Sequence, residues 1–232
     1  MQEEKIVMVM NDKNPVDNRL DGVSDNNYVI ASGVIVNRFD AKNAVLLTLM
    51  TRGGRKLDKR NYPQFVLTGE LREAAEGLRV KDHVQIKGVI SSRKNPKTGE
   101  YLPVINATSI ERTKSRLAEL TNEQELGRVR GLPTADFYVV GTITKFEAYG
   151  KGVVHLVIKS ILPDGKITYG SYYYFNNDLS GIINDLKVGN RICAMGEIQT
   201  EKKEIEGEKP RYIQTNVILD ISSVENILTL KR

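Results

Sequence analysis

The sequence contains no tryptophan, a single cysteine (Cys193) and two histidines, His83 and His155. One cysteine excludes a disulfide within the chain, and its apolar neighbours predict a buried, inert thiol. Two isolated histidines and one cysteine give neither zinc-site spacing nor a pair that predicts nucleophilic catalysis. The sequence therefore predicts a protein that is not an enzyme and that holds no metal or other cofactor.

Long apolar runs and nucleotide-binding loops are also missing. No apolar run approaches the ~20 residues that span a bilayer, and the first residues lack the basic segment of a signal peptide. Each Gly-Lys pair, Gly150-Lys151 and Gly165-Lys166, lacks a glycine five positions earlier, which the phosphate-binding loop of ATPases requires. We expect a soluble cytoplasmic protein with no membrane partner.

What the sequence does contain is an internal repeat with an offset of 108 residues, which holds from Gly33 to Ile90 without a gap. The matched positions are Gly33-Val34-Ile35 with Gly141-Thr142-Ile143, 45–49 with 153–157, Leu71 and Leu78 with Leu179 and Leu186, and Val80, Gly88 and Ile90 with Val188, Gly196 and Ile198. The period exceeds the roughly 20–50 residues of solenoid repeats, so each copy is interpreted as a domain. The predicted division is an extension (1–27), a first domain (28–112), a partly helical linker (113–135), a second domain (136–225) and a tail (226–232).

Both copies show the same order of elements. Alternating apolar residues and turn signals predict strands at 28–36, 45–51, 62–67, 82–91 and 101–110, and again at 137–145, 153–160, 167–175, 190–200 and 211–224. Thr68 and Asn176 are predicted to cap one helix each, between the third and fourth strands. This order is typical of the five-stranded OB barrel. The predicted fold is all-β with one short helix per domain, as two tandem five-stranded OB-fold barrels.

The charge is divided unequally between the copies. Residues 28–112 carry 15 Lys and Arg against 8 Asp and Glu, a net charge of +7, whereas residues 136–232 carry 12 of each. A basic domain points to a polyanionic partner.

Two motifs carry a family resemblance, Gly33-Val34-Ile35 at a strand and the run from Leu78 to Gly88, which recurs from Leu186 to Gly196. Over about 28–112 and 136–225 the chain resembles the bacterial and bacteriophage single-stranded DNA-binding proteins of the OB fold. With no tryptophan and a Leu228-Thr229-Leu230-Lys231-Arg232 end instead of an acidic tail, it is more similar to a phage or plasmid member. The resemblance implies binding and protection of single-stranded DNA in replication or recombination, in the host cytoplasm if phage-encoded, with replication or recombination proteins as partners and with oligomers allowed.

Sequence-tolerant binding of single strands needs cations along the phosphate path and rings on which bases stack. In OB folds the ligand lies on strands two and three and on the neighbouring loops. In the first copy these places hold the candidate nucleic-acid-binding residues Arg38, Lys42, Arg52, Arg55, Lys56, Lys59, Arg60, Tyr62, Arg93, Lys94, Lys97 and Tyr101.

The second copy is less basic and more aromatic. Under the 108 offset, Tyr173 and Phe175 match Phe65 and Leu67 and are predicted to be core, so Tyr172 and Tyr174 are expected on the binding face. The candidate residues here are Lys145, Phe146, Tyr149, Lys151, Tyr169, Tyr172 and Tyr174.

Three other functions fit the same residues. An RNA-binding OB protein would use the same cations. A protein-interaction module of a replication or transcription assembly would dock through the neutral second copy, and an accessory domain pair of a nucleic-acid enzyme would act only with its partner.

Overall fold

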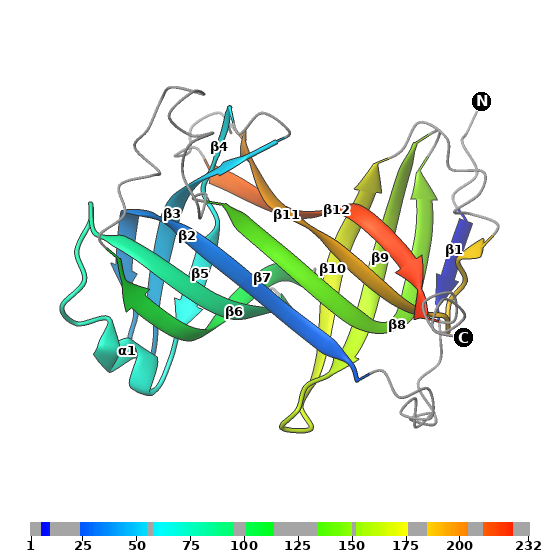
Figure 1. The fold of residues 1–232 in the computed structure, drawn as a ribbon, viewed down its shortest axis with the longest axis horizontal. Helices are drawn as coiled ribbons and strands as arrows, with labels where there is room; N and C mark the ends of the chain where they lie inside the picture. Colours follow the sequence, from blue (N-terminus) through cyan, green and yellow to red (C-terminus); the bar gives the residue numbers. More distant parts are fainter. Residues whose placement is uncertain are drawn as a thin grey trace. The chain divides into compact units, whose positions relative to one another are not determined.

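The computed structural model describes residues 6–9, 24–54, 58–94, 101–113, 134–149, 152–175, 185–203 and 211–224 (Figure 1). The chain divides into two compact units. The first unit comprises Tyr28–Phe137 with Glu197–Thr215, and the second comprises Tyr138–Gly196 with Met1–Asn27 and Asn216–Arg232. The described residues are mostly strand, and none of their helices has the length and apolar character needed to cross a bilayer.

In the first unit, β2 (Asn26–Asp40), β3 (Val45–Gly53), β4 (Lys59–Asn61), β5 (Gln64–Leu67), β6 (His83–Lys94) and β7 (Tyr101–Arg112) are the strands of the first copy. Strand β2 pairs antiparallel with β3 and β6, β3 with β5, and β6 with β7, whereas β5 and β7 are parallel. The short helix α1 (Glu70–Ala74) lies between β5 and β6 in the sequence.

The strands of the second copy are β8 (Ala135–Tyr149), β9 (Val153–Ile161), β10 (Ile167–Phe175), β11 (Arg191–Lys203) and β12 (Arg211–Ser223). Strand β9 pairs antiparallel with β8 and β10, and β10 pairs in parallel with β12. The short strand β1 (Ile6–Val9) adds to β8, with Ile6 opposite Ala148. The predicted second helix and most of the predicted linker, extension and tail lie outside the described residues.

Several backbone details recur at the 108-residue offset. In the first copy, the amide of Ile35 donates to the carbonyl of Asp82, and the amide of Lys81 donates to the carbonyl of Ile35. In the second copy, the amide of Ile143 donates to the carbonyl of Asn190, and the amide of Gly189 donates to the carbonyl of Ile143. A one-residue register shift, the mark of a β-bulge, follows Ile35 in β2 and Ile143 in β8.

The offset is not uniform, which corrects the ungapped alignment. Val45 pairs with Asp40 in the first copy, and Val154 pairs with Ala148 in the second. The second copy therefore has one more residue between its first two strands, and β9 matches β3 at an offset of 109. Strand β10 then matches β5 at 107, because Leu67 lies opposite Val45 and Tyr174 lies opposite Val154. Since side chains alternate between the faces of a strand, a shift of one residue exchanges the two faces.

Two local predictions also change. Gly69, with a φ of 56°, precedes α1, and no side chain caps the helix, so Thr68 is not its N-cap. The helix has five residues and gives way to a turn before buried Ala75 and Leu78, which makes it shorter than the apolar spacing predicted. Residues 59–61, expected in a connection, form β4 against the end of β3.

Each unit has an apolar core drawn from alternate strand positions. In the first unit, Val45, Leu47 and Leu49 on β3 are buried, and so are Phe65 and Leu67 on the neighbouring strand β5. In the second, Val154, Leu156 and Ile158 fill the corresponding places with Phe146 and Tyr172.

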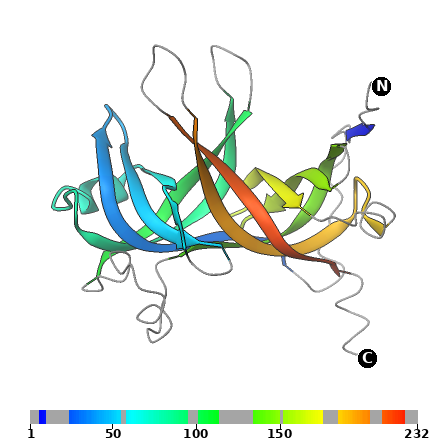
Figure 2. The same cartoon turned by 90° about the horizontal axis from the view of Figure 1, so that it is seen from above.

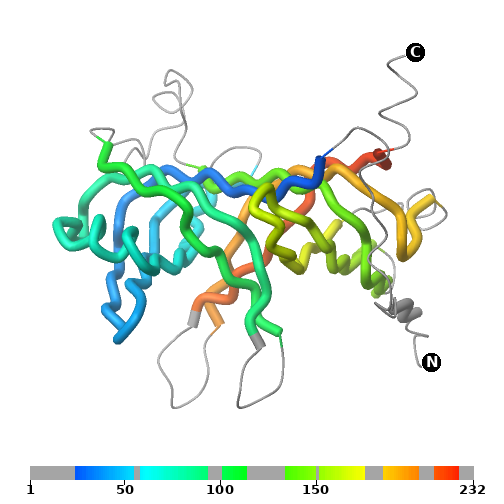
Figure 3. The backbone as a smooth tube through the Cα atoms, turned by 90° about the horizontal axis from the view of Figure 1, so that it is seen from below, coloured from blue at the N-terminus to red at the C-terminus, as the bar shows by residue number. Residues whose placement is uncertain are grey.

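The segment Glu197–Thr215 of the β11–β12 hairpin, which includes the end of β11 and the start of β12, belongs to the first unit. Figures 2 and 3 show this hairpin and the β6–β7 hairpin projecting in the same direction from that unit.

Candidate nucleic-acid interface

The bulge in β8 decides which of its side chains face outward. Beyond the register shift, Lys145, Glu147 and Tyr149 lie opposite Val157, His155 and Val153 on the outer face of β9. The same shift turns Phe146 inward, where only 4% of it is exposed. Phe146, predicted to touch nucleic acid from the loop after a strand that ends at residue 145, is therefore a core residue, because β8 continues to Tyr149 and the bulge turns this side chain inward.

Glu147 is a buried carboxylate with a hydrogen-bond donor on each side. Its Oε2 accepts from the Tyr149 hydroxyl at 2.9 Å, and it lies 2.8 Å from Nδ1 of His155 and 2.9 Å from Nζ of Lys145. The other ring nitrogen of His155, Nε2, lies 2.8 Å from Oγ of Ser171 on β10. A buried charge is tolerated only with such partners, so Glu147 fixes the positions of the residues around it.

A row of rings extends from this carboxylate across β9 and β10. The ring of Tyr173 stacks on His155, with centroids 4.7 Å apart, and Phe175 follows at 6.3 Å from Tyr173. Burial, reinforced by the negative charge of Glu147, raises the pKa of Tyr173, so its phenol stays neutral at physiological pH. Phe175 is 54% exposed, and Tyr169 is exposed farther along the same face of β10. We call His155, Tyr169, Tyr173 and Phe175 the ring row.

The one-residue shift overturns the predicted roles of the β10 tyrosines. Tyr172 is fully buried, and burial raises the pKa of its hydroxyl strongly. Tyr174 shares that inward side and is half-buried, whereas Tyr173 and Phe175, predicted to be core, face outward. The polar residues of β9 could have predicted this arrangement. His155 and Lys159 alternate with the apolar Val154, Leu156 and Ile158, which indicates that His155 and Lys159 lie on the outer face of the strand.

The first unit carries different chemistry at the matching places. Phe39, Leu46 and Val66 lie side by side where the second unit has Glu147, His155 and Tyr173. Phe39 is 59% exposed and was not among the predicted residues. The predicted strand ends at residue 36, whereas β2 continues to Asp40, and the bulge after Ile35 turns Phe39 outward.

Arg38, predicted to contact phosphate, is hydrogen-bonded to other residues of the first unit. Its Nη1 donates to the carbonyls of Ala75 and Leu78 at 2.5 and 2.6 Å, just beyond α1, and its other nitrogens donate to Asp40. The hydrogen bond with Asp40 raises the pKa of Arg38 and lowers that of Asp40. The guanidinium of Arg38 therefore links β2 to the turn that follows α1.

The remaining cations of the first unit differ in exposure. Arg52 is buried, and its pKa is lowered by burial and by the nearby charge of Arg60. Lys59 and Arg60 on β4, Lys42 in the β2–β3 turn and Arg93 on β6 are exposed, as is Tyr101 on β7. Arg55, Lys56, Lys97 and Lys151, and the side chain of Lys94, lie outside the described residues.

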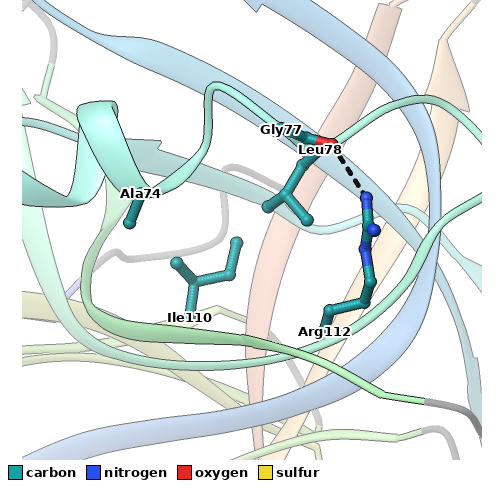
Figure 4. Close-up of a pocket in the computed structure, with 5 residues that line it drawn as sticks. All are labelled: Ala74, Gly77, Leu78, Ile110 and Arg112. Carbon is teal, nitrogen blue, oxygen red and sulfur yellow. Dashed lines mark hydrogen bonds between the residues drawn. The ribbon is translucent and has the colours of Figure 1, made fainter.

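A small hollow of about 270 Å³ lies beside α1, lined by Ala74, Gly77, Leu78, Ile110 and Arg112 (Figure 4). Arg112 donates to the Gly77 carbonyl at 2.8 Å and to Asp82 at 2.6 Å. The backbone amide of Arg79 bonds Asp82 too, and with Arg112 it lowers the pKa of that carboxyl. None of these lining residues was predicted to bind nucleic acid.

Within the described part of the chain, no three His, Cys, Asp or Glu side chains gather as metal ligands. Among the described residues, the ring row offers aromatic surface and β4 offers exposed positive charge.

No family model matches the sequence, and no curated protein matches it. The structure does match the crystal structure of the wild-type single-stranded DNA binding protein from Thermus aquaticus, with a TM-score of 0.60 and 15% sequence identity over 87% of this chain and 94% of that one. This likeness is one of fold.

A deletion mutant of the same Thermus aquaticus protein matches with a TM-score of 0.59 and 15% identity, over 86% of this chain and 95% of the other. The match extends over nearly the whole of both chains, so the resemblance in fold includes both units.

Proposed function

We propose that this chain binds single-stranded DNA with little sequence preference and, without being an enzyme, protects it during replication or recombination. The ring row carries the proposal, because outward-facing rings on the second and third strands of this copy lie where OB folds take their ligands. The fold shared with the Thermus aquaticus protein supports it.

We further propose that each copy is a five-stranded OB-type barrel and that the two arose by duplication. In the first unit the strand pairings run from β2 through β3, β5, β7 and β6 back to β2. In the second copy they run from β8 through β9, β10, β12 and β11 back to β8. The bulge and the backbone hydrogen bonds at the 108 offset support duplication.

Fluorescence titration with poly-dT at two salt concentrations tests the function. We expect tight binding at low salt and weaker binding at high salt, because bound cations displace counterions from the phosphates. Duplex DNA of the same length should bind weakly. No binding to poly-dT at either salt concentration would refute the function, and stronger binding to an RNA oligonucleotide would favour the RNA-binding alternative.

The electrostatic contribution has a separate test. Replacing exposed Lys59 and Arg60 by alanine should reduce the slope of log K against log salt by about 1.4, at roughly 0.7 for each single-strand phosphate contact. Lys166, exposed in the β9–β10 turn, is the matched control: Lys166→Ala should leave the slope unchanged. Equal slopes for the double variant and the wild type would remove β4 from the interface.

A further inference from the structure

Glu197 and Thr200 of β11 are hydrogen-bonded to Gly54, Asn61 and Tyr62 of the first unit. The amide of Gly54 donates to Oε2 of Glu197 at 2.9 Å, and the amide of Tyr62 donates to Oγ1 of Thr200 at 2.8 Å. In return, the amide of Thr200 donates to Oδ1 of Asn61 at 3.0 Å. Asn61 and Glu197 are both buried, so this contact is packed as well as hydrogen-bonded. The end of β11, although distant in the sequence, therefore packs against Gly54, Asn61 and Tyr62 and forms one surface with them.

The contact also brings two rings together. Tyr62, which follows β4, lies against Tyr212 of β12 with ring centroids 4.7 Å apart and planes at 43°. Tyr62 is half-buried, whereas Tyr212 keeps 48% of its surface exposed. A ring supported on one side and open on the other is the arrangement that base stacking requires.

Positive charge lies next to this ring pair. Arg60 and Lys59 are exposed on β4, immediately before Asn61 and Tyr62. Buried Arg52 lies opposite Arg60, and the lowered pKa of Arg52 reflects burial together with that second positive charge. The acidic Glu197 is buried and hydrogen-bonded to Gly54, while Asp58 and Glu201 are exposed nearby. Rings beside cations favour a single-stranded polyanion with bases.

We propose that Tyr212, supported by Tyr62 and flanked by Lys59 and Arg60, is a base-stacking position of the first unit that exists only when the β11–β12 hairpin is in place. Thr200 is a positioning residue, because its hydroxyl oxygen accepts a hydrogen bond from the amide of Tyr62, whose ring contacts Tyr212. This inference rests on the proposed function, and it gives the first unit, which lacks the ring row, a stacking surface completed by the second copy's last hairpin.

Titration of the full-length protein with a fluorescein-labelled dT oligonucleotide tests the assignment. Tyr212→Ala should weaken binding about 5- to 150-fold, the range for the loss of one base–aromatic stack. Tyr212→Phe should restore the affinity, because the ring remains. Ile213→Ala is the matched control, since Ile213 is the next residue and is 46% exposed, and it should change the affinity by less than about twofold.

A second readout separates stacking from charge. Tyr212→Ala should leave the salt slope unchanged, because the lost group is neutral, whereas loss of Lys59 and Arg60 lowers the slope. Thr200→Val keeps the volume of the side chain and removes its acceptor, so it should weaken binding less than Tyr212→Ala does.

The outcomes distinguish this inference from the function on which it rests. Wild-type binding that Tyr212→Ala leaves intact, or that Ile213→Ala weakens equally, overturns the stacking position while single-strand binding stands. If the wild type itself does not bind the oligonucleotide, the proposed function fails first. Thermal unfolding of each variant shows whether a lost affinity reflects a lost fold.

Discussion

The two units differ in side-chain chemistry at three matching positions on the side of the strands away from the apolar core. The first unit has Phe39, Leu46 and Val66, and the second has Glu147, His155 and Tyr173. The supporting backbones are similar, with a bulge at the same place and the same turn hydrogen bonds, although the second copy has one more residue in its first connection. Similar backbones therefore carry apolar side chains in the first unit and ionisable, stacked side chains in the second.

The shared scaffold can be broken at its matched glycines. A Cβ at Gly141 would lie closer than 3.0 Å to the Lys159 carbonyl and to Oγ of Ser160, and one at Gly33 would meet the Met50 carbonyl equally closely. We expect Gly141→Ala and Gly33→Ala each to cost about 3 kcal/mol in the free energy of unfolding, the upper part of the range for overpacking. Urea unfolding measures the loss.

Gly77→Ala is the control, since nothing lies within 4 Å of an added Cβ there. If Gly33→Ala did not lower the free energy of unfolding while Gly141→Ala did, the close approach of the two strands at Gly33 would matter less than the one at Gly141.

Replacing Tyr173 by valine gives the second unit the residue that the first unit has at Val66. We expect the affinity for a dT oligonucleotide to fall by about 1–3 kcal/mol, because one stacking ring is lost. Exposed Phe175→Ala should act in the same direction with less effect on stability. Val66→Ala, measured in the same titration, should have almost no effect on binding, and an equal loss there would contradict the assignment of stacking to the ring row.

Glu147→Gln removes the charge that the first unit lacks at Phe39. Hydrogen bonds to a charged group contribute more than neutral ones, so we expect a loss of about 1–2 kcal/mol in the free energy of unfolding. The pKa of Tyr173 should also fall towards its ordinary value, since the nearby negative charge is removed, and ultraviolet titration of the tyrosines measures this. Glu201→Gln changes the same charge on an exposed strand and should alter stability by less than about 0.5 kcal/mol.

The smallest expected effect concerns Asp82 and its counterpart Asn190. Both side chains accept a hydrogen bond from a backbone amide three residues earlier, from Arg79 and from Lys187. Asp82→Asn should therefore keep the turn and lose only the charge facing Arg112, at a cost below about 1 kcal/mol near neutral pH.

The pH dependence of that difference has a definite sign. The folded pKa of Asp82 is lowered, so its contribution is present above the unfolded pKa near 3.8 and disappears as the pH falls through the folded value. Thermal unfolding of wild type and Asp82→Asn should differ at pH 7 and converge in acid. A difference that persists in acid would show that the loss lies in the turn.

Much of the fold follows from the sequence, because alternation of apolar residues and turn residues is local. The strands lie close to their predicted places, and Gly33 and Gly141 mark matching close approaches. Less of the candidate site could be predicted from the sequence. Lys145, Tyr149 and Tyr169 do lie on the outer face, but Phe146 and Tyr172 are core, and His155 is part of the ring row.

The sequence by itself determined the unequal charge of residues 28–112 and 136–232, and its apolar alternation predicted most of the strands. Only the tertiary structure decided which face each side chain takes, because a single bulged residue or one added residue in a connection exchanges the two faces of a strand. It alone also placed Arg38 beside α1 and Tyr212 against Tyr62, since contacts between distant segments depend on how strands pack.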